Sequence, residues 1–129
     1  MPVTYSIHGN LLKLEFIGRN APDDVIKTFE SAMKDPACPN PAALLVDVSR
    51  SESLATVPVP EIRRVAEHLG PFSGRIGGRA AVVASSDVHF GLSRLGSVYS
   101  EGVGVEVQVF RDVESAAAWL GINPSKGQQ

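Results

Sequence analysis

The chain has 129 residues, with 12 Lys and Arg against 14 Asp and Glu, a formal net charge of −2 at pH 7, and 43% hydrophobic residues. This length corresponds to one domain, which can bury enough apolar surface to fold without disulfides or a structural metal. The nearly balanced charge excludes the broad basic surface that nucleic-acid binding needs, so no nucleic-acid partner is predicted.

The ends of the chain and its cysteine indicate a location. Residues 1–8 lack the basic stretch and apolar run of a secretory signal, and no apolar run approaches the roughly 18 residues that span a bilayer. The single cysteine, Cys38, lies in a proline-rich stretch without a neighbouring His or Lys, which predicts an unreactive thiol. We therefore expect a cytoplasmic protein that does not insert into membranes.

The N-terminal pattern predicts a hairpin and a helix. Apolar and polar residues alternate over residues 3–8 and 12–16 with a turn at residues 8–10 between them, which is typical of a β-hairpin. Pro22 then opens a helix. Its apolar face consists of Val25, Ile26, Phe29, Ala32 and Met33.

Two continuous apolar runs, residues 43–48 and 80–84, follow and have the length of strands covered on both faces. The helix between them has the apolar stripe Ile62, Val65, Ala66 and Leu69. A third helix follows the second run, and its predicted core stripe is Val88, Leu92, Leu95 and Tyr99. An alternating strand over residues 105–110 and a short helix capped by Asp112 complete the chain.

These elements predict the order ββαβαβαβα and an α/β fold with one mixed sheet. Strands joined through helices are parallel with right-handed crossovers, while the hairpin adds an antiparallel strand. We expect one domain over residues 1–121 and a polar, disordered C-terminal tail over residues 122–129.

Motifs for catalysis, metals and cofactors are not found in the sequence. The glycines at 74, 77 and 78 precede a strand, whereas phosphate-binding glycines open a helix. The three histidines are far apart, and no Gly-x-Ser-x-Gly elbow is present. The sequence therefore predicts a protein that is not an enzyme and holds neither a cofactor nor a metal.

A cluster of polar residues is expected where the central strands end. The carboxyl ends of parallel strands meet at one edge of a sheet, where ligands tend to bind. A regulatory or partner-binding rim is predicted there, made of Asp47, Ser49, Thr56, Ser86 and Asp87. The alternative is that these side chains cap helices and turns.

The chain resembles the STAS superfamily, most closely its SpoIIAA-like branch, over about residues 5–121. The residues that carry the resemblance are Gly9–Leu14, Leu44–Val48, Ala81–Ala84 with Phe90-Gly91-Leu92-x-Arg94, and Val105–Asp112 followed by Ala116-x-x-Trp119-Leu120. The resemblance implies a protein-interaction module, regulated in some members by phosphorylation of a serine in an Asp-Ser-Ser-Gly motif. Here Ala55-Thr56-Val57-Pro58 replaces that motif, so Thr56 is the only hydroxyl in register.

The fold also resembles the CRAL-TRIO lipid-carrier domains, which implies an apolar pocket under the third helix. Its predicted lining is Phe90, Leu92, Leu95, Val98 and Tyr99, and the alternative is that these side chains fill the core. The sequence thus favours a non-enzymatic bacterial STAS-like module that binds an unidentified protein partner or forms a homodimer. Binding of a small apolar or lipid-like ligand is the alternative function.

Overall fold

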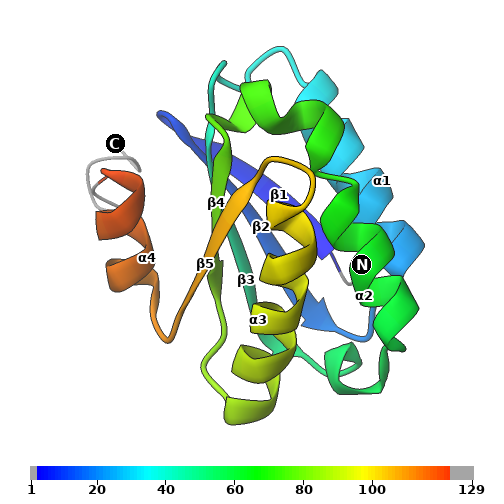
Figure 1. Ribbon diagram of the computed structural model, residues 1–129. Helices are drawn as coiled ribbons and strands as arrows, with labels where there is room; N and C mark the ends of the chain where they lie inside the picture. The colour runs from blue at the N-terminus through cyan, green and yellow to red at the C-terminus, as the bar shows by residue number, and fades with distance from the viewer. Residues whose placement is uncertain (1–2, 123–129) are drawn as a thin grey trace.

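The computed structural model describes residues 3–122 (Figure 1). Its strands are β1 (Val3–His8), β2 (Leu11–Gly18), β3 (Ala43–Ser51), β4 (Arg79–Val83) and β5 (Glu106–Phe110). Its α-helices are α1 (Pro22–Lys34), α2 (Val59–Glu67), α3 (Asp87–Glu101) and α4 (Val113–Leu120), and two 3₁₀ segments, η1 (Leu54–Thr56) and η2 (Gly70–Ile76), flank α2. The predicted order of strands and α-helices is confirmed.

The five strands form one mixed sheet in the order β1-β2-β3-β4-β5. β1 and β2 are antiparallel, and their turn uses Gly9, whose φ of 59° suits glycine. The remaining neighbours are parallel, with Val46 of β3 beside Val82 of β4. The predicted hairpin and parallel centre are both confirmed.

The helices cover the two faces of the sheet unequally. Figure 1 shows α1, α2 and α3 on one side of the sheet and α4, in orange and red, on the other. Strands that follow one another across a sheet through right-handed crossovers place every connecting helix on the same face. On the opposite face, Ala116 and Leu120 of α4 pack on Leu45 and Val83.

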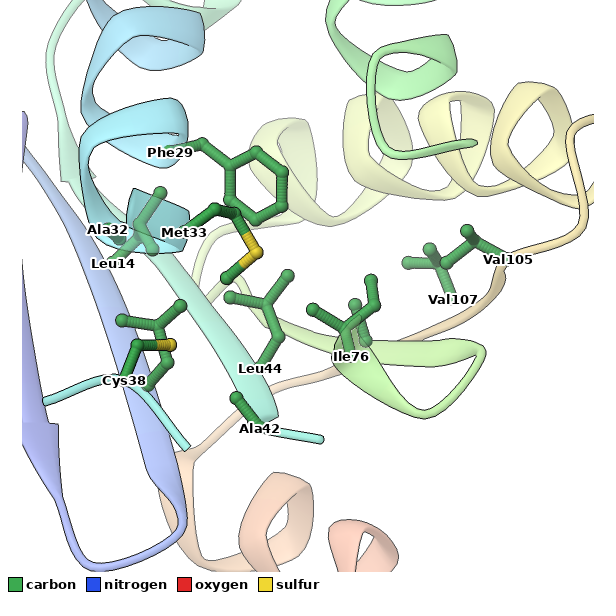
Figure 2. Close-up of a cluster of buried hydrophobic side chains, with 12 residues drawn as sticks. Leu14, Phe29, Ala32, Met33, Cys38, Ala42, Leu44, Ile76, Val105 and Val107 are labelled. Carbon is green, nitrogen blue, oxygen red and sulfur yellow. The ribbon is translucent and has the colours of Figure 1, made fainter. Parts of the chain in front are cut away.

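The main core lies between α1 and the sheet. Figure 2 shows Phe29 and Met33 of α1 close to Leu44, with Ile76 beyond them. Phe29 also meets Phe72 of η2 edge to face, with the ring centroids 5.2 Å apart. The helical face predicted around Phe29 and Met33 is therefore confirmed.

The core stripe predicted for α3 is wrong at Val88, which is 57% exposed, whereas Leu92, Leu95 and Tyr99 are half-buried. Val98, predicted to line an apolar pocket, is 61% exposed, and Ser100 is the buried residue of this helix. The reason is that α3 lies against α2 through small residues, and short side chains allow two helices to approach closely. The sequence period gives two adjacent stripes on this helix, one of large apolar residues and one of small residues. The period does not decide which of the two faces the core.

Two further expectations concern chain organisation. Residues 3–122 contribute to one sheet and its helical layers, while residues 123–129, most of the expected tail, lie outside the described residues. Within the described range, no helix combines the length and the apolar character needed to cross a bilayer.

Candidate functional site

The candidate site is an apolar cavity in the three-helix layer. α1 and α3 rest on opposite parts of the sheet, whereas α2 packs mainly against α1 and α3 rather than on the strands. Between α1 and α3, the space under α2 is only partly filled. The valines Val46 and Val82 at the centre of the sheet therefore keep accessible surface.

The cavity has a volume of about 160 Å³. Its floor is formed by side chains of β2, β3, β4 and β5, including Leu14, Val46 and Val82. The walls and roof are formed by Val25, Ile26 and Phe29 of α1, Leu92, Ser93, Gly96, Ser97 and Ser100 of α3, and Ile62, Val65 and Ala66 of α2. The cavity is partly open to solvent, and its apolar lining favours an apolar guest over water, which needs several polar partners to be bound stably.

Of the five predicted lining residues, the cavity uses one. Leu92 lines it, whereas Phe90, Leu95, Val98 and Tyr99 lie outside the lining because α3 is rotated relative to the prediction. Phe90 instead lies under the guanidinium of Arg111, 4.2 Å from its ring centroid, and Tyr99 lies under that of Arg63 at 5.6 Å.

The missed part of the lining is a stripe of small residues on α3: Ser93, Gly96, Ser97 and Ser100. Their spacing of i, i+3, i+4 and i+7 places them on one helical face. This spacing is the sequence pattern from which that part of the lining could have been predicted. Two of them set the distance to α2. The hydroxyl of Ser100 bonds to Ala66, and a Cβ on Gly96 would lie 3.6 Å from Cγ2 of Ile62.

Apart from the serines of α3, the polar residues of the lining are Asn20, Glu61 and His68, on the side of the cavity nearer α1. Glu61 and His68 belong to α2 and its C-terminal end, and Asn20 precedes α1. His68 Nε2 lies 3.0 Å from Glu30 Oε2 of α1, and Arg64 Nη2 lies 2.8 Å from Asp23 Oδ1. The His68–Glu30 contact and the Arg64–Asp23 ion pair link the roof helix to α1, and each contributes only weakly to stability because water screens it.

The predicted polar rim is divided between two places, the adjoining ends of β3 and β4 and the η1 segment. Asp47 Oδ1 accepts a hydrogen bond from the Ser49 amide, and Ser49 Oγ accepts one from the Ser85 amide at 3.1 Å. Ser86 caps α3 by accepting the His89 amide, and Asp87 forms a 2.8 Å ion pair with Arg111. The hydrogen bond between Ser49 and Ser85 thus brings these four residues to one edge of the sheet.

Thr56 occupies the other place. It lies in η1, in a shallow hollow also lined by Arg19 and Asn20, and donates to the Ser53 carbonyl oxygen at 2.8 Å. All five rim residues thus have hydrogen-bond or ion-pair partners within the protein, the arrangement expected if they cap turns and helices. Their regulatory role stays a prediction.

Cys38 has one neighbour that the sequence did not indicate. Arg75 lies beside the thiol, although it is 37 residues further along the chain. Burial nevertheless raises the pKa of Cys38, and the guanidinium opposes that shift only in part. At neutral pH the thiol is therefore protonated and weakly nucleophilic. Among residues 3–122, no group of three or more His, Cys, Asp and Glu side chains is arranged to hold a metal ion.

We compared the chain with protein-family models, with curated proteins and with solved structures, and none of the three comparisons gave a match.

Proposed function

We propose that this protein binds a small apolar molecule in the cavity beneath α2. The observation that carries the proposal is the 160 Å³ space over Val46 and Val82, with its almost wholly apolar lining. An engineered apolar cavity of about 150 Å³ stays dry and binds benzene. The guest therefore has the size of one ring or a short alkyl chain.

Three polar residues of the lining suggest that the ligand also carries a polar group. Asn20, Glu61 and His68 are partly exposed and border an otherwise apolar space. Glu61 and His68 are at opposite ends of α2, about 10 Å apart along its axis. A ligand with an apolar body and a polar group near either residue fits this arrangement, because the body leaves water while the polar group keeps hydrogen-bond partners. The structure supports this function through Leu92 and the small residues of α3 rather than through the lining predicted from the sequence.

Benzene is the probe for the first experiment. We expect benzene to shift the methyl NMR signals of Val46 and Val82 in a saturable way and to raise the midpoint of thermal unfolding, since a ligand that binds only the folded state stabilises it. Val82→Phe fills the cavity from the floor and should abolish both effects. The matched control, Val59→Phe, adds the same ring at a half-exposed position outside the cavity and should leave both unchanged.

Overpacking costs roughly 1–3 kcal/mol, so folding of the Val82→Phe protein has to be checked by circular dichroism. If that variant fails to fold, Ser97→Leu fills the cavity from α3 instead. Benzene binding that survives in a folded cavity-filling variant, or that is not seen in the unmodified protein, would refute the proposal. If benzene binds as expected, native mass spectrometry of gently purified protein identifies the natural guest as an adduct on the 13.7 kDa chain that is lost on denaturation.

A second candidate function is binding of a protein partner, which the STAS resemblance implies. The observation in its favour is the exposed apolar surface of α3, where Val88 and Val98 point to solvent. Membership of the STAS superfamily and a cytoplasmic location stay predictions. Cell fractionation of the tagged protein tests the location.

A further inference from the structure

α3 has an apolar stripe on its outer surface, away from the cavity. The stripe consists of Val88, Gly91, Leu95 and Val98, with spacings of three, four and three residues. Three of these residues are exposed and Leu95 is half-buried, and the glycine leaves open space where a Cβ would be. In Figure 1, α3 is the green-yellow helix in the foreground. This spacing is that of the contact positions in two helices that pack along each other.

Charged residues flank the stripe along one side. Asp87, Arg94 and Glu101 follow one another at intervals of seven residues, so they share one edge of α3. Asp87 is paired with Arg111 at 2.8 Å. Within residues 3–122, neither Arg94 nor Glu101 has an ion-pair partner, and both side chains are exposed. Two unpaired, opposite charges therefore lie about 10 Å apart along the helix axis, beside the apolar stripe.

We propose that the α3 stripe binds the α3 stripe of a second copy of this chain, in an antiparallel pair about a two-fold axis. The inference names the partner for the second candidate function and rests on it, but it does not depend on a ligand in the cavity. A two-fold axis between Leu95 and Val98 places Leu95 of each copy against Val98 of the other. The same axis brings Arg94 of each copy opposite Glu101 of the other, so each contact is made twice.

Charge distinguishes this partner from a membrane surface. The edge of the stripe carries two carboxylates and one guanidinium, whereas a helix that lies on an anionic bilayer is rich in Lys and Arg on its polar face. A second copy, by contrast, supplies the complement of each unpaired charge. The seam of one 15-residue helix is at the small end of protein interfaces, so the dimer is expected to be weak and to exchange with monomer.

Analytical ultracentrifugation over protein concentrations up to roughly 1 mM tests the proposal, a range chosen because interfaces of this size are weak. The unmodified protein should show a monomer–dimer equilibrium. Arg94→Glu and Glu101→Arg each replace two attractive contacts by two repulsive ones and should raise the dissociation constant by about tenfold or more. Both positions are exposed, so circular dichroism should show unchanged folding in both variants.

The decisive measurement mixes the two variants. The Arg94→Glu protein carries a carboxylate at both positions of the pair, and the Glu101→Arg protein carries a guanidinium at both. In an equimolar mixture, an antiparallel heterodimer therefore has opposite charges at each of its two contacts, and association should return to the unmodified level. A protein with both substitutions should also dimerise normally. If either side chain had only a structural role, mixing the two variants would not restore their association.

Three results would overturn the proposal. They are a protein that stays monomeric at every concentration, a dimer whose dissociation constant is unchanged by the charge reversals, and a mixture that associates no better than either variant alone. The first of these leaves the cavity function intact, because benzene binding is measured on the monomer. If the monomeric protein instead floats with phosphatidylcholine vesicles and Val98→Ser abolishes flotation, the stripe binds lipid and the dimer is excluded.

Discussion

Ser100 of α3 donates a buried hydrogen bond, 3.3 Å long, to the carbonyl oxygen of Ala66 in α2. The two residues are 34 positions apart in the chain, and their contact holds the roof helix of the cavity against its wall. Ser100 Oγ also lies 3.3 Å from the Gly96 carbonyl oxygen, so its single proton is shared between the two acceptors.

Ser100→Ala should therefore reduce the free energy of unfolding by about 1 kcal/mol, since the hydrogen bond between α2 and α3 is lost. Urea denaturation followed by circular dichroism measures the change. The matched control is Ser97→Ala, on the same helix, whose hydroxyl bonds only to the Arg94 carbonyl oxygen of its own helix and which should cost less. Equal losses in the two variants would mean that the hydrogen bond between α2 and α3 adds nothing to the free energy of unfolding.

Gly96→Ala should raise the free energy of unfolding by roughly 0.5–1 kcal/mol, because alanine is favoured over glycine inside a helix. The added Cβ would lie 3.6 Å from Ile62 Cγ2, an ordinary van der Waals distance. Gly91→Ala, with open space around its Cβ, is the control and should give a similar gain. If Gly96→Ala destabilises the protein while Gly91→Ala stabilises it, α2 and α3 are packed too closely for a methyl group.

The titration of Tyr5 should depend on Asp35. The Tyr5 hydroxyl donates to Asp35 Oδ2 at 2.8 Å, and this hydrogen bond, followed by desolvation, raises the pKa of Tyr5. The amide of Ala37 and then the hydroxyl of Tyr5 lower the pKa of Asp35. Asp35→Ala should therefore shift tyrosinate formation at residue 5 to lower pH. Ultraviolet titration in a Tyr99→Phe background isolates this signal, because the chain has two tyrosines.

The sign of the linked stability follows from these directions. A tyrosine with a raised pKa contributes stability below its ordinary pKa and loses it as the pH rises through the raised value. A carboxyl with a lowered pKa contributes above its ordinary value and loses that contribution as the pH falls. Asp23→Ala, which removes an exposed carboxylate without touching Tyr5, should leave the tyrosine titration unchanged, and an equal shift in both variants would argue for a general charge effect.

Leu120→Ala should destabilise the protein by about 2–5 kcal/mol, the usual cost of truncating a buried leucine. Leu120 packs with Ala116 against Leu45 and Val83 and anchors α4 to the sheet. Trp119, the only tryptophan, lies against Phe110 with centroids 5.8 Å apart, so its fluorescence reports the docking of α4. Val113→Ala, at the half-buried start of the same helix, should cost less. A Leu120 variant as stable as the unmodified protein would show that α4 contributes little to the fold.

The amino-acid sequence by itself determined the order of the elements and the type of sheet. Alternation over residues 3–8 and the apolar runs at 43–48 and 80–84 are local patterns, and the periods of strands and helices differ enough to be distinguished locally. Capping is local as well. Asp112 accepts the Ser115 amide at 2.7 Å, as its position before an apolar helix predicts.

Only the tertiary structure decided which side of α3 faces inward. The helix has a stripe of large apolar residues beside a stripe of small ones, and the apolar period alone predicts that Val88, Leu92, Leu95 and Tyr99 face the core. The structure places Ser100 inside and Val98 outside, because α2 lies too close to α3 for large residues to fit between them. That rotation joins Leu92 and the small residues of α3 to the cavity and leaves Val88 and Val98 in solvent. Both candidate surfaces of this protein thus depend on the distance between two helices, which no local pattern encodes.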